Sequence, residues 1–252
     1  MVTFDSRTAG TSAEIWNADA RRHRLPELRL EGIDELIVIA AHPDDETLGA
    51  GGLIAECSII GIPIHVVVVT DGAGSHPHST TVTPVGLAVR RRRETTNAVR
   101  RLAPAAVVTF LDFGDGTIRE NREQVRIEVD CIVAKASQNA LLVAPWRGDG
   151  HRDHRILGEV TAEANAGRGI RFLEYPIWLW HWSSPELDST PWKQFSALRM
   201  SESTLAAKNA AIRLHESQVA PLSAAPGDEA VLDSQFLRNF EHDAEVFIAP
   251  ER

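Results

Sequence analysis

The sequence predicts an α/β protein with a mostly parallel sheet and helices on both of its faces. Short apolar runs alternate with longer amphipathic stretches along most of the chain. The apolar runs are continuous, which is typical of strands buried on both sides. Strands that alternate with helices are joined by right-handed crossovers, and their pairing is therefore parallel.

Each element follows from its own local pattern. The runs LIVIAA at 36–41 and HVVVVT at 65–70 are the clearest buried strands, and Gly61 and Pro63 end the helix expected between them. A serine start and a high alanine and leucine content favour the last helix. The predicted strands cover 36–41, 65–70, 106–111 and 140–144, and the predicted helices cover 12–23, 47–60, 85–102, 122–137 and 201–217.

Nearly all of the notable polar residues follow predicted strands. In a parallel sheet the carboxyl ends of the strands share one edge, and ligands bind beyond that edge. We therefore expect one site formed by the loops at 42–46, 71–74, 112–116 and 146–154.

No linker, internal repeat or low-complexity segment divides the chain, so we expect a single domain over 1–252. It would carry an N-terminal extension over about 1–33 and a less regular C-terminal part over about 172–252. The net charge of −9, from 26 Lys and Arg against 35 Asp and Glu, argues against nucleic acid and anionic membranes as partners. The arginines at 90–93 lie in a predicted helix and are interpreted as a solvated face with one or two functional members.

Cys57 and Cys131, the two cysteines, lie in apolar segments and are expected to be buried thiols in a reducing compartment. No apolar stretch has the length of a signal peptide at the start, or of a membrane span elsewhere, so we expect a cytoplasmic protein without a stable membrane anchor. A homo-oligomer is compatible with the sequence.

The motif HPDDE at 42–46 places one imidazole and three carboxylates directly after a buried strand. Like charges this close repel one another unless a cation or hydrogen bonds compensate. An N-terminal cap of the next helix would explain one aspartate, but not the histidine or the doubled acid. The motif therefore predicts a metal site or a catalytic site.

The motif HRDH at 151–154 follows another strand, and its two histidines share a helix face if a helix begins there. Together the two motifs predict an open zinc site with His42, Asp45 and His154 as ligands and the fourth position free for water. Asp44 is then placed to act as general base. His151 is the second catalytic group, with Asp153 favouring its protonated form, which would stabilise an oxyanion.

AHPDDE followed far downstream by HRDH resembles the PIG-L/LmbE-like family of zinc-dependent N-deacetylases. Further family positions match in order, and the resemblance covers about 37–218. It implies a Rossmann-like fold, zinc and amide hydrolysis on a small amino-sugar derivative. Arg91 and Asp115 match positions that contact sugar hydroxyls or a substrate phosphate. A surface salt bridge for Arg91 and a turn residue for Asp115 are equally open interpretations.

The leading hypothesis is a metal-dependent hydrolase that removes an N-acetyl group from an amino sugar or its conjugate. The alternatives are an amidase acting on a larger thiol or antibiotic conjugate and a non-catalytic sugar-binding protein. A two-metal phosphodiesterase would need more carboxylates and histidines than are gathered here. Ligands of this type also accept Fe²⁺ or Co²⁺.

Overall fold

The computed structural model describes residue 8 and residues 10–250. Its strands are β1 (Glu35–Ala40), β2 (Ile64–Thr70), β3 (Val107–Phe113), β4 (Ala140–Pro145), β5 (Arg171–Tyr175), β6 (Phe195–Arg199) and β7 (Ala244–Ile248). Its α-helices are α1 (Ala13–Ala18), α2 (Asp45–Ile59), α3 (Pro84–Leu102), α4 (Arg122–Val133), α5 (Arg152–Asn165), α6 (Leu179–Trp182), α7 (Glu202–Ile212), α8 (Glu216–Val219) and α9 (Ser234–Leu237). Short 3-10 turns are η1 (Arg22–Arg24), η2 (Trp192–Gln194) and η3 (Arg238–Phe240).

Within the described residues seven strands form one sheet in the order β3-β2-β1-β4-β5-β7-β6. The first five strands along the chain pair in parallel with their neighbours. β7 is antiparallel to β5 and to β6. The predicted α/β class with a mostly parallel sheet is confirmed. Strands from the N-terminal and C-terminal parts of the chain share this sheet. The organisation as a single domain stays a prediction.

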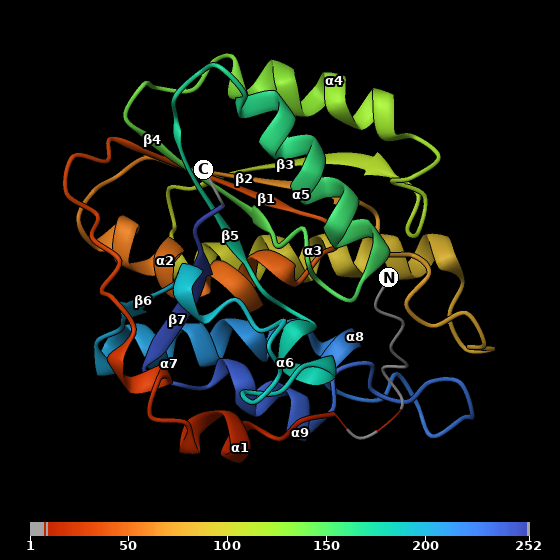
Figure 1. The fold of residues 1–252 in the computed structure, drawn as a ribbon. Helices are drawn as coiled ribbons and strands as arrows, with labels where there is room; N and C mark the ends of the chain where they lie inside the picture. Colours follow the sequence, from red (N-terminus) through yellow and green to blue (C-terminus); the bar gives the residue numbers. More distant parts are fainter. Residues whose placement is uncertain (1–7, 9, 251–252) are drawn as a thin grey trace.

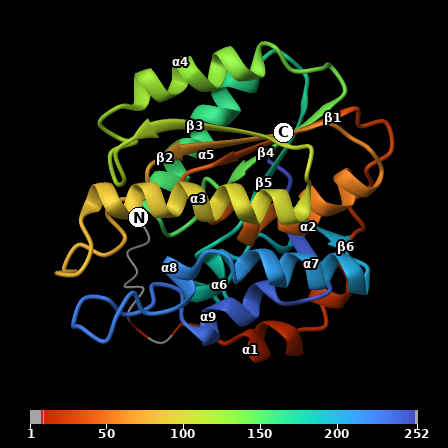
Figure 2. The ribbon, with the colours of Figure 1, turned by 180° about the vertical axis from the view of Figure 1, so that it is seen from behind.

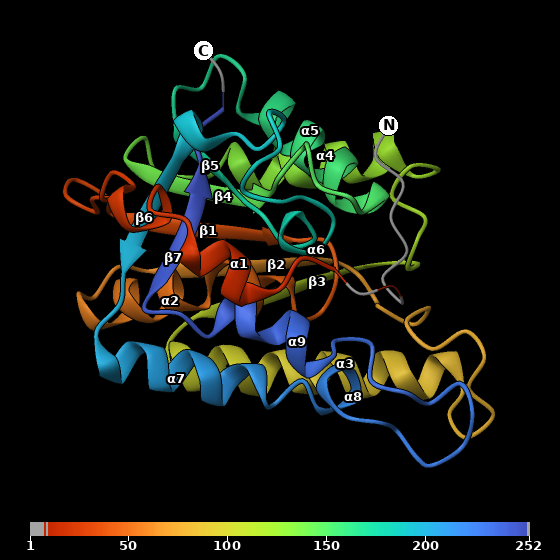
Figure 3. The ribbon, with the colours of Figure 1, turned by 60° about the horizontal axis from the view of Figure 1, so that its bottom comes forward.

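Helices cover both faces of the sheet (Figures 1 and 2). α4 and α5 pack together on one face, and α2 and α3 cover the other. α7 forms a further layer against α2 and α3, and it runs beside α3 when the molecule is viewed from below (Figure 3). Among the described residues, no helix combines the length and the apolar character that a membrane span requires.

The two helical layers explain why the sequences of the central strands β1, β2 and β4 are mostly apolar. In β1 the side chains of Leu36 and Val38 join the core on the α2 side, and those of Ile37 and Ile39 join the core on the α5 side. Successive side chains of a strand point to opposite faces, so a strand covered on both faces has few positions that suit a polar residue.

The glycines of α2 allow close packing around the centre of the sheet. A Cβ atom on Gly49 would lie 2.1 Å from the Tyr175 ring, and one on Gly52 would lie 2.2 Å from Met200 Sδ. The Tyr175 hydroxyl donates to Ile39 O at 2.7 Å. Glycine destabilises a helix interior by about 1 kcal/mol relative to alanine. In α2 this loss is offset because the missing side chain lets the helix approach β5 closely.

Some details differ from the sequence prediction. The C-terminal part is more regular than expected because it supplies β5, β6 and β7. The helix predicted over 201–217 is interrupted between α7 and α8. Cys131 is exposed on α4 and not buried, while Cys57 is buried as expected.

The strand order places a topological switch between β1 and β4. From β1 the chain continues to β2 on one side, and from β4 it continues to β5 on the other. The loops that leave these two strands diverge, and such a divergence opens a crevice at the carboxyl ends of the strands.

Candidate metal centre and active site

The predicted metal ligands lie where the loops after β1 and β4 meet. His42 follows β1 by two residues, and Asp45 is the first residue of α2. On the other side, His151 directly precedes α5 and His154 lies in its first turn. His42 and His154 are 112 positions apart in the sequence, yet their rings are in contact. The structure therefore brings the two motifs together.

Three donor atoms form a nearly equilateral triangle. His42 Nδ1 lies 3.2 Å from His154 Nε2. Asp45 Oδ2 lies 3.3 Å from His42 Nδ1 and 3.2 Å from His154 Nε2. Zinc bonds to nitrogen and oxygen are about 2.0–2.2 Å long, which places neighbouring donors of a tetrahedral site roughly 3.3 Å apart. The donor set therefore fits one zinc-sized cation.

His151 is a further donor close to this triangle. Its ring nitrogen and those of His42 and His154 lie within 4.8 Å of one another, so the three rings form a second possible donor set. The set with Asp45 has the tetrahedral spacing, and its carboxylate supplies negative charge for a cation. We therefore favour Asp45 as the third ligand.

The second nitrogen of His42 faces two carboxylates. Nε2 lies 3.3 Å from Asp115 Oδ1 and 3.5 Å from Asp153 Oδ2. Burial by itself would lower the pKa of His42, but Asp115, Asp153 and Asp45 raise it well above the ordinary value. A carboxylate behind a ligating imidazole fixes the orientation of the ring and raises its basicity.

His154 has a similar partner in Asp149, a fully buried residue in the loop after β4. Asp149 Oδ2 lies 3.7 Å from His154 Nδ1 and accepts hydrogen bonds from the backbone N–H groups of Ile177 and Trp178. Burial opposes a charge on His154, yet Asp45 and Asp149 raise its pKa to about 9. No local sequence pattern marks Asp149, because only the folded loop brings it behind His154.

Asp44, the predicted general base, has a strained backbone with φ 150° and ψ −27°. Such conformations cost about 1–3 kcal/mol in residues other than glycine and cluster at functional sites. Its side chain does not cap α2, so the simpler capping interpretation does not hold. Burial raises the pKa of Asp44 to about 6, although Arg91 opposes the shift.

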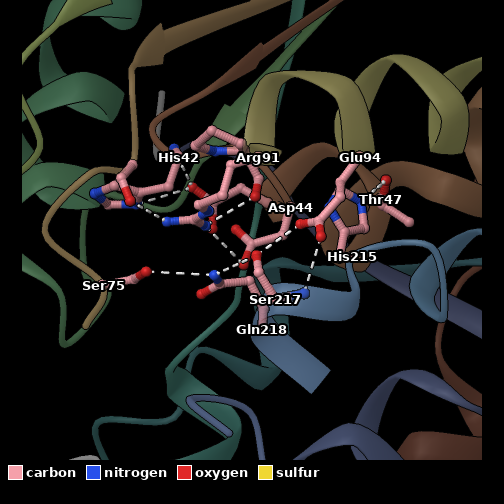
Figure 4. Close-up of polar contacts among 12 residues, drawn as sticks. His42, Asp44, Thr47, Ser75, Arg91, Glu94, His215, Ser217 and Gln218 are labelled. Atoms are coloured by element: carbon pink, nitrogen blue, oxygen red, sulfur yellow. Dashed lines mark hydrogen bonds and ion pairs between the residues drawn. The ribbon is translucent and has the colours of Figure 1, made fainter. Parts of the chain in front are cut away.

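Arg91 holds Asp44 from behind (Figure 4). Its Nη2 donates to Pro43 O at 2.8 Å and to Asp44 Oδ2 at 3.1 Å, and its Nη1 donates to Gly72 O at 2.8 Å. Arg91 is only 3% exposed. The burial rules out a surface salt bridge, while a contact between Arg91 and substrate stays a prediction, since Arg91 also lines the cavity described below.

A second set of hydrogen bonds reaches Asp44 from helix α2 and from the residue before α8. Glu46 Oε2 accepts the Asp44 backbone N–H at 3.1 Å, and Thr47 Oγ1 donates to Glu46 Oε1 at 2.6 Å. His215 Nε2 lies 3.0 Å from Thr47 Oγ1 (Figure 4). All four residues are buried. We call this series of hydrogen bonds the Glu46–Thr47–His215 relay.

His151 and Asp153 differ from the prediction in their contacts. Asp153 meets His151 through its backbone N–H, which donates to Nδ1 at 3.3 Å, while its carboxylate faces His42. Burial, together with the neighbouring imidazoles of His42 and His154, lowers the pKa of His151 to about 3. A lowered pKa disfavours the imidazolium form in the metal-free protein, and the catalytic role of His151 stays a prediction.

These residues open onto a cavity of about 160 Å³. Asp115 lines it, as the sequence suggested, while also accepting the Gly74 N–H at 3.0 Å. Five lining residues come from the C-terminal part, for which no site residue was predicted: Ile177, Trp178, Gln218, Val231 and Leu232. The full lining comprises His42, Asp44, Asp45, Leu48, Gly74, Ser75, Arg91, Asp115, His151, His154, Ile177, Trp178, Gln218, Val231 and Leu232.

The fold and this site together define an α/β protein with a cavity whose imidazoles and carboxylates fit a divalent cation. A family model described as PIG-L, GlcNAc-PI de-N-acetylase, matches residues 37–165, about half of the chain. The chain belongs to this family, which confirms the resemblance inferred from the two motifs.

One curated relative is the diacetylchitobiose deacetylase of Thermococcus kodakarensis, which is 31% identical over 140 residues. The match covers 55% of this chain and 51% of the relative, so the chain spans about half of that protein's length.

Two solved structures share the fold. The zinc-inhibited form of the teicoplanin deacetylase Orf2 superimposes with a TM-score of 0.64 at 17% identity, covering 85% of this chain and 97% of that one. The 4-carboxy-2-hydroxymuconate hydratase GalB of Pseudomonas putida KT2440 gives 0.57 at 20% identity, covering 83% of each chain. Since a deacetylase and a hydratase have the same fold, the fold alone does not choose the reaction.

Proposed function

We propose that this protein is a zinc-dependent N-deacetylase that removes an acetyl group from an amino sugar or an amino-sugar conjugate. The proposal depends on one observation: His42, Asp45 and His154 form a donor triangle, and Asp44, which is not part of the triangle, lines the same cavity. Family membership supports amide hydrolysis on an N-acetylated sugar, and the 31% identical relative is a deacetylase of such a sugar.

In this proposal His42 Nδ1, Asp45 Oδ2 and His154 Nε2 hold the metal. Zinc is the favoured ion because two imidazoles and a carboxylate are typical of open catalytic zinc sites, while Fe²⁺ and Co²⁺ remain chemically compatible. When bound, zinc polarises an amide carbonyl and acidifies water. Asp115 and Asp149 would orient the two ligating rings from behind.

Asp44 and His151 would move the protons. A carboxylate whose pKa is raised to about 6 can accept a proton from water near neutral pH and return it to the departing amine. His151 lines the same cavity, where its ring can donate a hydrogen bond to the amide oxygen as negative charge develops there. Asp153 is reassigned in this scheme to supporting His42.

The size of the cavity supports a small acyl group. Pockets that hold drug-sized ligands are about 300–1,000 Å³, whereas this one is about 160 Å³. The acetamido group and the adjoining ring edge would enter, while the rest of a conjugate would remain outside. This favours acetyl over a long acyl chain and sets the proposal apart from an amidase that engulfs a larger conjugate.

The experiment is amine release from N-acetylated sugars by zinc-loaded protein, with a chelated sample as the blank. Asp44→Ala should keep stoichiometric zinc and lose at least about 100-fold in kcat, since general acid–base catalysis contributes about 10²–10⁴-fold. Asp188→Ala, which removes an exposed acid, is the matched control. A protein that binds sugar equally well with and without Asp44 and never releases amine would be a sugar-binding protein.

A further inference from the structure

A continuous series of hydrogen bonds connects helix α3 to the wall of the cavity (Figure 4). It begins at Glu94 of α3 and continues through Ser217 and Gln218 of α8 to Ser75, in the loop after β2. Glu94, Ser217 and Gln218 are buried. Gln218 and Ser75 line the cavity, whereas Glu94 does not. The series therefore joins a carboxylate behind the wall to two residues of the wall itself.

One end of the series is a carboxylate, which can only accept hydrogen bonds. Glu94 Oε1 accepts from Arg90 Nε at 2.9 Å and from the Ser217 backbone N–H at 3.0 Å. Glu94 Oε2 accepts from the Ser217 hydroxyl at 2.6 Å. Because a carboxylate has no proton to donate, the proton of the Ser217 hydroxyl points toward Glu94. Ser217 Oγ is then left to accept a hydrogen bond from Gln218.

The series continues beyond Ser75 to a backbone carbonyl, which also only accepts. His76 Nδ1 lies 3.0 Å from Ser75 Oγ, and His76 Nε2 lies 3.1 Å from Glu229 O. Burial lowers the pKa of His76, and a neutral imidazole has one N–H donor and one acceptor nitrogen. Nε2 must be the donor, so Nδ1 accepts from the Ser75 hydroxyl. Ser75 Oγ is therefore also left to accept from Gln218.

The two serine hydroxyls fix the orientation of the Gln218 side-chain amide. Gln218 Nε2 donates to Ser217 Oγ at 2.9 Å and to Ser75 Oγ at 3.3 Å, which uses both of its protons. If the amide were turned by 180°, its oxygen would face two hydroxyl oxygens whose protons point elsewhere. In the observed orientation, the carbonyl oxygen Oε1 accepts no hydrogen bond from the described residues. This oxygen is the polar atom of Gln218 that remains for a further partner.

We propose that Gln218 Oε1 accepts a hydrogen bond from an N–H or O–H group of the bound substrate, and that Glu94 is a positioning residue that fixes this orientation. The inference rests on the proposed deacetylase function and adds to it a substrate contact from the C-terminal part. Gln218 lines the same cavity as Asp44. An N-acetylated sugar carries an amide N–H and several hydroxyls, so it offers donors to this oxygen.

Gln218→Met tests the contact by removing the acceptor at similar side-chain volume. KM for N-acetylglucosamine, or for the N-acetylated sugar of the screen that wild-type protein cleaves fastest, should rise about fivefold, as expected for one lost hydrogen bond. A contact made equally in the ground state and the transition state changes KM and leaves kcat nearly unchanged. Zinc should stay stoichiometric. A KM equal to that of the wild type overturns the inference and leaves the deacetylase function standing.

Glu94→Gln tests the positioning role because it reverses the polarity of the series. The new amide keeps its oxygen toward Arg90 and the Ser217 N–H, while its NH2 group donates to Ser217 Oγ. The Ser217 hydroxyl then donates to residue 218, and Gln218 turns its own NH2 group toward the cavity. The rise in KM should match that of Gln218→Met. Glu56→Gln is the matched control, since Glu56 is a half-buried glutamate on α2 that accepts from Thr204 Oγ1 outside the cavity.

The reciprocal exchange provides a rescue that a merely structural role would not produce. Glu94→Gln combined with Gln218→Glu keeps the net charge. The reversed Ser217 hydroxyl donates to the new carboxylate, whose other oxygen is again an acceptor for substrate. KM should return to near the wild-type value, whereas Gln218→Glu alone places two carboxylates around one hydroxyl and should not restore it. A folded, zinc-bound double variant that keeps the KM of Glu94→Gln overturns the inference.

A second double variant decides the question if the reciprocal exchange does not fold. Because Glu94 is proposed to act only through Gln218, Glu94→Gln combined with Gln218→Met should have the KM of Gln218→Met alone. Effects that multiply would overturn the positioning role. Absence of amine release by the wild type from every N-acetylated sugar of the screen would overturn the deacetylase function, and the inference with it.

Deoxy analogues of the sugar identify the donor. If a hydroxyl donates to Gln218, the effect of Gln218→Met on KM should disappear for the analogue that lacks this hydroxyl. If the amide N–H donates, the effect should persist for every deoxy analogue. An effect of Gln218→Met on kcat alone, with KM unchanged for all analogues, would contradict a contact with the bound substrate.

Discussion

At the scale of single residues, the site depends on how Asp44 is held. Its backbone lies in a region that residues other than glycine rarely adopt. Arg91 binds its carboxylate and the preceding carbonyl, and Glu46 accepts its N–H. These contacts keep the Asp44 side chain at the wall of the cavity. The side chain of the adjacent Asp45 points toward the imidazoles of His42 and His154.

Arg91→Ala should therefore damage turnover more than metal binding. We expect kcat to fall about 10- to 100-fold, because a misplacement of 1 Å near the chemistry can cost 10²-fold, while bound zinc stays stoichiometric. Arg91 lowers the pKa of Asp44, so its loss raises that pKa. The acid limb of the pH–rate profile should consequently move to higher pH, which steady-state kinetics across pH will measure.

Gly72→Ala offers an independent check on the same contact. The backbone of Gly72 has φ +65°, and a Cβ there would lie 2.4 Å from Arg91 Nη1. The alanine variant should displace the guanidinium and resemble Arg91→Ala in its kinetics. Loss of zinc in either variant would show that Arg91 supports the ligands and not the base.

At the scale of elements, the Glu46–Thr47–His215 relay connects the start of α2 to the residue before α8. Thr47→Val removes the hydroxyl that links His215 to Glu46, whereas Thr47→Ser keeps it. One lost hydrogen bond is worth about 1 kcal/mol, so kcat should fall about fivefold in the valine variant and little in the serine variant. Kinetics and zinc content measured on both variants will decide whether the relay positions Asp44.

The two cysteines test the burial of α2 and α4 separately. Burial raises the pKa of the Cys57 thiol to about 12, and Cys131 is exposed on α4. The thiolate is the reactive form, so a thiol reagent should modify Cys131 rapidly in the native protein and Cys57 only after unfolding. Cys131→Ser should abolish the fast phase; a fast phase that persists would place Cys57 at the surface.

The elements predicted from sequence were those with a strong local pattern. The runs that became β1 and β2 are mostly apolar because helices cover both faces. β6 and β7 were not predicted, because FSALR and AEVFI are short runs that pair antiparallel with each other outside the strand–helix alternation. The break before α8 was also missed, since it arises where His215 turns toward Thr47.

The predicted site residues came together for a reason of topology, since His42, Asp45 and His154 follow strands that are neighbours in the sheet. Their roles stay predictions, although the geometry around them is compatible with a metal. The orientation of Arg91 could not be predicted, because it depends on how closely α3 approaches the loop after β1. The partners Asp115 and Asp149 likewise depend on long-range packing that no local pattern records.

At the scale of the whole molecule, β7 supports the middle of α2 through one buried carboxylate. Glu245 accepts the N–H groups of Gly52 and Leu53 at 2.5 and 2.8 Å, and Lys208 from α7 pairs with it at 2.7 Å. Breaking a buried ion pair by removing one partner costs about 3–5 kcal/mol. Lys208→Met should lower the free energy of unfolding by that order.

Chemical denaturation of a double-mutant cycle will test this coupling. Glu245→Gln in the Lys208→Met background removes the uncompensated charge and keeps an acceptor for the α2 backbone. We expect the double variant to recover at least half of the stability lost in the single lysine variant. Additive losses would contradict a direct coupling between the two side chains.

The distance in sequence between Gly52 and Glu245, 193 positions, has a consequence for biosynthesis. The ribosome delivers the helix that bears Asp45 long before it delivers the carboxylate that completes the hydrogen bonds of that helix. A nascent chain would expose His42 and Asp45 with an unfinished support beneath them. Stable capture of a metal ion should therefore wait until Glu245 has left the ribosome and paired with α2.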